Sequence, residues 1–212
     1  MDLSEYIVFI KNLPFKEQSF FPHLSRWEKL LSDSVSPRSL PPDIAEGYSR
    51  GDLMDGLSLS EDKVIKILMW GYPYGGRGNN IKNVLSSIPE IVRILKDIET
   101  SELNERELVE ISKKFEDIKG LGRSTWSKFL YFNATRFEGG PLLILDQKIE
   151  RALNGKSVNG IRFCVLNDKD GNTYVEYLRS MNGLGDRLNL STDALELFFF
   201  MFYDIFRLFR NR

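Results

Sequence analysis

One stretch of sequence decides how this chain folds: Ile118-Lys119-Gly120-Leu121-Gly122-Arg123-Ser124, then a helical segment, then Pro141-Leu142-Leu143-Ile144-Leu145-Asp146-Gln147. The two glycines predict a tight turn between helices, because glycine allows backbone angles and close approaches that a Cβ atom forbids. The helix after the turn begins at once, so its free amides and positive dipole end point at the same place. Such a turn suits a phosphate, although a plain helix–turn–helix connection is an equally good interpretation of the glycines alone.

A single carboxylate, Asp146, follows the apolar run and precedes a short helical segment at 147–153. An N-cap is one good interpretation of an aspartate at this position. Beside a sugar C1′, a carboxylate can also stabilise an oxocarbenium-like transition state and orient or deprotonate water, as in glycoside hydrolysis. The two roles are compatible.

Helical periodicity dominates the rest of the chain. Ser60 is a good N-cap for the apolar stripe at 64–68, the segment 84–95 reads as helix broken near Pro89, and the segments 103–115, 174–188 and 192–209 are also helical. We therefore expect an all-α fold with at most a minor β element.

The composition excludes several classes of protein. The chain has 212 residues, 42% of them hydrophobic, and a net charge of −1, so a basic surface for nucleic acid must be local. One histidine, His23, and one cysteine, Cys164, leave no transition-metal cluster and no internal disulfide framework, and we expect no metal and no cofactor. The start of the chain lacks a signal-peptide pattern, and the most apolar window, 195–209, is too short to span a bilayer. We expect a monomeric cytoplasmic protein without a membrane segment.

The stretch from Ile118 to Gly122, the helix with Lys128-Phe129-Leu130-Tyr131-Phe132, and the run that ends at Asp146 together resemble the helix-hairpin-helix DNA glycosylase superfamily. The likeness is strongest to the bacterial branch that resembles 8-oxoguanine glycosylases, over about residues 105–153, with weaker likeness across most of the chain. The resemblance implies one unit over residues 1–212 with two helical lobes. One lobe covers about 60–135 with the hairpin at 118–122, and the other combines the N-terminal segment with 136–212. Double-stranded DNA is the implied partner, bent so that the target nucleotide flips into a pocket between the lobes.

The resemblance also assigns roles near the hairpin. The backbone amides around the two glycines hold a DNA phosphate, and the expected phosphate-binding residues are Lys119, Gly120, Leu121, Gly122, Arg123 and Ser124. Members that cleave the DNA strand carry a lysine two residues after the second glycine, where this chain has Ser124. We therefore expect Asp146 to activate water and an abasic site to be left. Lys128, one helical turn after Ser124 on the same face, is the alternative nucleophile, whereas a solvated or phosphate-contacting lysine is its ordinary interpretation.

Two further segments are candidates for contacting the DNA or the flipped base. The aromatic and glycine-rich loop at 70–80 resembles the asparagine-rich segment that fills the space left by the base. Its candidates are Tyr72, Tyr74, Arg77, Asn79, Asn80 and Lys82. The ordinary alternative is a connection whose aromatics fill the core. In the last helix, a phenylalanine is expected to stack on the base, with Phe199, Phe200 and Phe202 as candidates and Glu196 or Asp204 as polar groups at the pocket wall.

The sequence therefore predicts a monofunctional DNA N-glycosylase. It would flip a damaged or modified base, either an 8-oxoguanine-like purine in DNA repair or a modified base of phage DNA in defence. Two alternatives stay open at this point: a non-catalytic DNA-binding or adaptor protein that keeps the hairpin, and a bifunctional glycosylase/lyase that uses Lys128. The sequence does not name the base.

Overall fold

The computed structural model describes residues 1–34, 36–41, 47–55, 58–76, 79–99, 101–164, 166 and 171–208. Its α-helices are α1 (Ile7–Lys11), α2 (Leu24–Ser32), α3 (Arg50–Asp55), α4 (Glu61–Gly71), α5 (Asn80–Ser86), α6 (Ile88–Lys96), α7 (Glu105–Glu116), α8 (Arg123–Phe132), α9 (Gln147–Leu153), α10 (Gly171–Leu188) and α11 (Thr192–Leu208). Two 3-10 turns, η1 (Ser4–Tyr6) and η2 (Phe15–Glu17), lie near the N-terminus.

The strands are two residues long. Two antiparallel pairs are formed by β1 (Ser19–Phe20) with β2 (Tyr48–Ser49) and by β6 (Ser157–Val158) with β7 (Ile161–Arg162). A mixed three-stranded sheet has the order β3 (Glu102–Leu103), β4 (Arg136–Phe137), β5 (Gly140–Pro141), in which β4 is parallel to β3 and antiparallel to β5. The predicted all-α class with a minor β element is confirmed.

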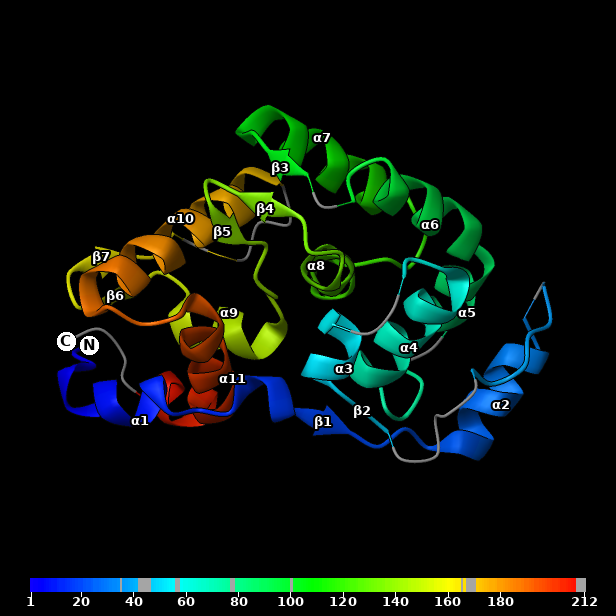
Figure 1. Cartoon of the computed structure of the whole chain (residues 1–212), viewed down its shortest axis with the longest axis horizontal. Helices are drawn as coiled ribbons and strands as arrows, with labels where there is room; N and C mark the ends of the chain where they lie inside the picture. Colours follow the sequence, from blue (N-terminus) through cyan, green and yellow to red (C-terminus); the bar gives the residue numbers. More distant parts are fainter. Residues whose placement is uncertain are drawn as a thin grey trace.

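Helix α8 lies at the centre, and the other helices surround it (Figure 1). In this view α1, α9, α10 and α11 lie on the left, α2 to α6 lie on the right, and α7 runs along the top. The N-terminal segment, which we assigned to the second lobe, reaches both sides. Its α1 packs against α11, whereas α2 lies beside the end of α4, with the Trp27 indole donating to the Tyr72 carbonyl at 3.1 Å.

The central position of α8 follows from its side chains. Every residue from Thr125 to Phe132 is buried, and an all-round buried helix must have partners on each face. Trp126 lies parallel to Phe115 of α7 at a centroid distance of 6.4 Å, and the edge-to-face partner of the same indole is Tyr174 of α10, at 4.8 Å. Helix α8 therefore joins the two sides of the molecule.

Local signals in the sequence set several helix boundaries. The Ser60 hydroxyl accepts from the Lys63 amide at 3.2 Å and caps α4, as predicted. The helical segment predicted to break near Pro89 does so at Ser87, and Pro89 occupies the first turn of α6, where its missing N–H costs nothing. Helix α11 is kinked at Phe202, whose backbone angles are not helical.

The hairpin turn packs tightly against the start of α5. Gly120 has φ +85°, and a Cβ atom added there would lie 2.8 Å from the Asn80 carbonyl oxygen. Glycine is thus needed twice, for the positive φ and for the close approach. The contact brings the glycine turn and the asparagine-rich loop, the two segments predicted to touch DNA, to one place.

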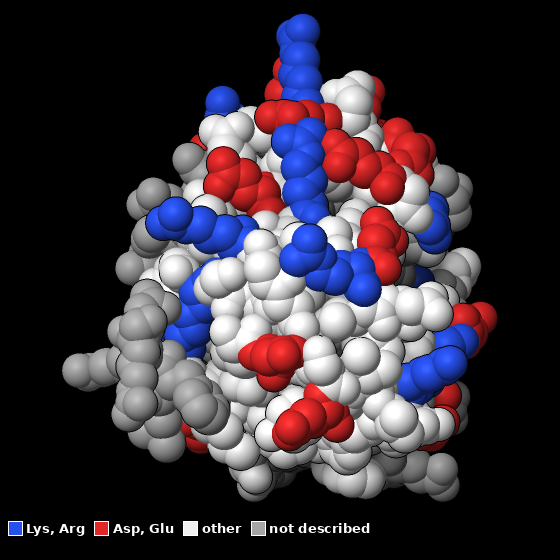
Figure 2. All heavy atoms as spheres, turned by 90° about the vertical axis from the view of Figure 1, so that its left-hand side faces the viewer, with Lys and Arg blue, Asp and Glu red and all other residues white. Residues whose placement is uncertain are grey.

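The surface of the molecule on the left-hand side of Figure 1 carries no continuous positive patch among its described residues. Figure 2 shows lysine and arginine interspersed with acidic residues there, above a largely uncharged area. No helix of the described residues is long and apolar enough to cross a membrane.

Replacing Gly120 by Ala should lower the free energy of unfolding by more than the same change at Gly139. Gly139 also has a positive φ, +77°, but a Cβ atom there meets nothing within 4 Å. Both variants incur the left-handed backbone cost of about 1–2 kcal/mol, and only Gly120→Ala adds a steric clash of roughly 1–3 kcal/mol. Denaturant unfolding measures the difference, and equal losses would contradict the close packing of the turn on Asn80.

Candidate functional site

A cavity of about 690 Å³ lies where the glycine turn, the start of α9 and the end of α4 meet. Gly120, Gly122, Ser124 and Lys128 line it from the hairpin and α8, and Asp146 lines it from the start of α9. This volume is in the range of small-molecule and cofactor sites. The cavity therefore brings three of the six predicted hairpin residues together with Lys128 and Asp146.

The Asp146 carboxylate is held in a fixed orientation. Its Oδ1 accepts from the amides of Lys148 at 2.9 Å and Ile149 at 3.0 Å, so it caps α9. Among the described residues, no group donates to its Oδ2. One oxygen thus serves the helix, and the other is available to a molecule in the cavity.

The segment that carries Asp146 is buried and extended, so its backbone needs hydrogen-bond partners from side chains. Tyr174 donates to the Leu143 carbonyl at 2.7 Å, and Tyr177 donates to the Ile144 carbonyl at 3.0 Å. The Leu145 amide donates to the Ser127 hydroxyl of α8 at 3.2 Å. Helices α8 and α10 therefore set the position of the carboxylate.

Lys128 is buried in the wall of the cavity, with 5% of its surface exposed. Its Nζ donates to the Ser124 carbonyl at 2.5 Å and to the Ser124 hydroxyl at 3.1 Å. Gly71 makes room for its stem, because a Cβ atom there would lie 2.8 Å from Lys128 Cδ. The structure thus corrects the interpretation of Lys128 as a solvated lysine: its amine sits at Ser124, inside the cavity.

The other residues of the hairpin differ in what they can contact. Lys119 is exposed, and the side chain of Leu121 is buried in the core. Arg123 is also buried, and its guanidinium donates to Glu150 at 3.1 Å and to the Leu166 carbonyl. For Arg123 to contact a phosphate, its ion pair with Glu150 would have to break, because the buried guanidinium is already paired with that carboxylate.

Some of the residues predicted in the loop after α4 line the cavity, and others do not. The Tyr72 hydroxyl shares a 2.5 Å hydrogen bond with the Thr125 hydroxyl of α8, and Tyr74 is 70% exposed at the rim. Tyr72, Tyr74 and Asn80 line the cavity. Asn79 and Lys82 are exposed and lie outside its lining, and Arg77 lies outside the described residues.

Of the three candidate phenylalanines of α11, Phe200 alone lines the cavity. Phe199 is fully buried in the core, and Phe202, at the kink, packs against Phe9 and Phe198. Lys148, which the sequence did not single out, lies with Nζ 4.1 Å from the centroid of the Phe200 ring. This is within the range of a cation–π contact.

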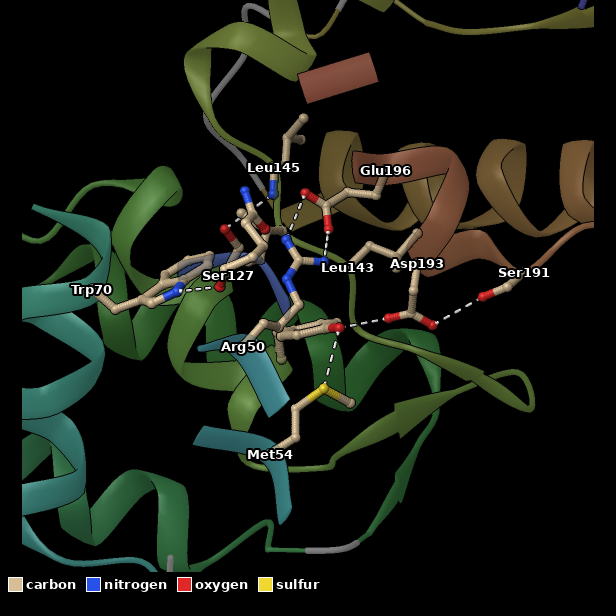
Figure 3. A network of polar contacts seen from close by, with 12 residues as sticks. Arg50, Met54, Trp70, Ser127, Leu143, Leu145, Ser191, Asp193 and Glu196 are labelled. Atoms are coloured by element: carbon tan, nitrogen blue, oxygen red, sulfur yellow. Dashed lines mark hydrogen bonds and ion pairs between the residues drawn. The ribbon is translucent and has the colours of Figure 1, made fainter. Parts of the chain in front are cut away.

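The sequence singled out Glu196 as a polar group at the pocket wall but missed its partner in a buried ion pair, Arg50. Arg50 and Glu196 are each 1% exposed, and Arg50 Nη1 donates to Glu196 Oε2 at 2.6 Å (Figure 3). Burial lowers the pKa of Arg50, but Glu196, Tyr131 and Asp193 together outweigh burial and hold that pKa above its ordinary value. Burial raises the pKa of the Glu196 carboxyl, against the opposing charge of Arg50. The sequence signal was weak, because only the alternation in Gln18-Ser19-Phe20 and Tyr48-Ser49-Arg50 indicates a ribbon.

The described residues hold no group of three or more His, Cys, Asp or Glu side chains arranged to bind a metal ion. The cavity lining offers the Asp146 carboxylate, the buried Arg50–Glu196 pair, the buried amine of Lys128, the amides of a helix start and several aromatic rings.

Comparison with known proteins identifies one matching family model. No curated protein and no solved structure matches the chain. The family model described as "Putative 8-oxoguanine DNA glycosylase OGG-like protein" matches residues 14–200, which include all of the elements that line the cavity. The match covers well over half of the sequence, and the chain therefore belongs to this OGG-like family.

Proposed function

We propose that this protein is a DNA glycosylase that flips a damaged or modified base out of double-stranded DNA and hydrolyses its N-glycosidic bond. One observation carries the proposal: a single cavity brings together Asp146, the glycine turn, the buried amine of Lys128 and the rings of Tyr72 and Phe200. Family membership supports the same reaction class. A flipped base needs such a cavity, with ring faces for stacking and a catalytic group at C1′.

The glycine turn supplies the grip on the DNA backbone. A Cβ atom at Gly122 would meet nothing within 4 Å, so the surface beside it is open to a ligand. The first turn of α8 points its amides and the positive end of its dipole there, which favours a phosphate. Lys119 is exposed beside the turn and adds a positive charge. This local site suits a protein whose net charge is −1.

Asp146 is the proposed catalytic carboxylate. As the bond between C1′ and the base breaks, positive charge develops on the sugar, and a nearby carboxylate stabilises it. Water then attacks C1′ and passes its proton to Oδ2, and the departing base takes the electron pair of the broken bond and a proton. The result is a free base and an abasic site.

Replacing Asp146 by Asn should abolish base release while the fold and DNA binding persist. Asparagine is an equally good N-cap, so α9 keeps its start, whereas the carboxylate charge is lost. We expect the single-turnover rate to fall by about 10²–10⁴-fold. Alkali-sensitive sites in duplexes that each carry one modified base, of oxidised or phage type, give the measurement.

The matched variant Asp146→Ala separates catalysis from capping. It should lose base release and, in addition, about 1 kcal/mol of stability, because alanine cannot cap α9. A wild-type protein that binds every duplex of the panel and releases no base would favour the adaptor function. An Asn variant as active as the wild type would remove Asp146 from the mechanism.

The position of Lys128 supports a second candidate, a glycosylase that also cleaves the strand. Its Nζ lies in the cavity on Ser124, the position at which strand-cleaving relatives are expected to carry their lysine. A neutral Lys128 amine would attack C1′, the base would leave with the bonding electrons and a proton, and ring opening would give a Schiff base. Loss of the 3′ phosphate by β-elimination would then cut the DNA.

Borohydride trapping distinguishes the two candidates. With water as nucleophile, we expect no covalent adduct when protein and substrate duplex react in the presence of borohydride. The abasic product should stay intact until alkali is added. An adduct that forms with wild type and with Lys119→Ala, but not with Lys128→Ala, would overturn the monofunctional proposal in favour of Lys128.

A further inference from the structure

Two buried polar atoms in the wall of the cavity have no hydrogen-bond partner among the described residues: Gln18 Oε1 and Arg50 Nε. The other two unpartnered buried side-chain atoms, in Trp126 and Asn133, lie away from the cavity. A buried polar group without a partner costs about 1–3 kcal/mol, so a pair of them at one cavity calls for an explanation.

The β1–β2 ribbon explains why these two atoms lie together. Ser19 pairs with Ser49 and Phe20 pairs with Tyr48, so the antiparallel register next brings Gln18 opposite Arg50. The Arg50 amide donates to the Gln18 carbonyl at 2.8 Å and extends the ladder by this pair. Alternate residues of a strand point to the same face, and Gln18, Phe20 and Arg50 all line the cavity while Ser19 and Ser49 do not.

Arg50 is held so that its Nε–H is left over. Its two terminal nitrogens donate to the Glu196 carboxylate, at 2.6 and 3.3 Å. The guanidinium carbon lies 5.6 Å from the Trp70 ring centroid and 5.0 Å from that of Tyr131. Figure 3 shows Arg50 between Trp70 and Glu196, and the Trp70 indole is itself anchored on the Gln18 carbonyl at 3.2 Å. The register therefore places a rigid residue with an unpaired donor opposite a residue with an unpaired acceptor.

We propose that Gln18 and Arg50 read the edge of the flipped base, with Gln18 Oε1 accepting from a base N–H and Arg50 Nε–H donating to the neighbouring base oxygen. This inference rests on the proposed function and deepens it. The rings of Phe20 and Phe200, 6.4 Å apart, lie on the same cavity wall and supply apolar contact for the base.

The donor and acceptor define a class of base. Their complement is a lactam edge, an N–H next to a carbonyl oxygen, as in oxidised guanine. The guanidinium donor favours an oxygen with a large negative partial charge, because charge-assisted hydrogen bonds are the stronger ones. The Glu196 carboxylate offsets the charge of Arg50, so the selection rests on the direction of the two hydrogen bonds. The cavity is thus suited to carbonyl-bearing bases.

The test measures binding without turnover, in the full-length Asp146→Asn protein. The readout is the ratio of Kd values for two duplexes, one with a tetrahydrofuran abasic analogue and one with 8-oxoguanine. Gln18→Met keeps the length of the side chain and removes its amide, and we expect the preference for 8-oxoguanine to fall by roughly 10-fold. Arg50→Lys keeps a positive charge facing Glu196 but lacks the Nε–H, and we expect a similar or larger fall.

The control variant is Gln147→Met, which removes the other glutamine of the chain from the same cavity; its amide has no unpartnered buried atom. It should leave the ratio unchanged. Base analogues sharpen the assignment: methylation of 8-oxoguanine at N1 or at N7 blocks one lactam N–H at a time. One of these two methylations should weaken binding of the duplex to the parent protein. The same methylation should not weaken binding to Gln18→Met any further.

Several outcomes would overturn the inference: an equal preference in Gln18→Met and the parent, an equal loss in Gln147→Met, or a parent that does not prefer 8-oxoguanine over the abasic site. Gln18→Met decides the matter even if Arg50→Lys fails to fold. Excision by proteins with Asp146 intact is scored separately. Normal excision, with a preference that is unchanged in Gln18→Met, would contradict the base-reading role alone. A preference that depends on Gln18, without any excision, would contradict only the proposed reaction.

Discussion

The architecture depends on one constraint, the burial of an extended segment that belongs to no sheet. Residues 142–145 are buried in the core, and their carbonyl and amide groups would be costly to leave unpaired. Tyr174 and Tyr177 of α10 and Ser127 of α8 provide the partners. Because α8 begins at the glycine turn and α10 packs on its other side, the bonds that satisfy the segment fix Asp146 relative to that turn. The same contacts therefore pack the core and set the position of the Asp146 carboxylate.

The Arg50–Glu196 pair illustrates a different use of burial. Removing two charges from water costs several kcal/mol per ion, and their attraction repays this only with good geometry. Here both terminal nitrogens of Arg50 face one carboxylate, and two aromatic rings flank the guanidinium. The pair joins the N-terminal ribbon to the last helix, across 146 residues of sequence. It is weak evidence for stability, and its place in the cavity wall fits the proposed reading of a base.

Predictions that rest on neighbouring residues are confirmed where the structure tests them. Ser60 caps α4, and the helix breaks at Ser87 beside Pro89, because both effects depend on the backbone within one turn. Predictions that depend on packing were less specific. Three phenylalanines of α11 were equivalent in sequence, and the direction of the helix decides that Phe200 lines the cavity while Phe199 joins the core. Arg123 has the chemistry of a phosphate ligand, yet the helix buries it against Glu150.

The sequence by itself determined the helical class, the glycine turn and the aspartate after the apolar run, because periodicity, positive φ and helix capping are local properties. Only the tertiary structure decided that Lys128 returns to Ser124 and that a two-residue ribbon brings Gln18 and Arg50 to the same cavity. The ribbon joins residues far apart in the chain, and the Lys128 stem lies against Gly71, which is also distant in sequence. A strand of two residues has too little pattern to be recognised, and a lysine in a helix carries no sign of which way its stem will bend.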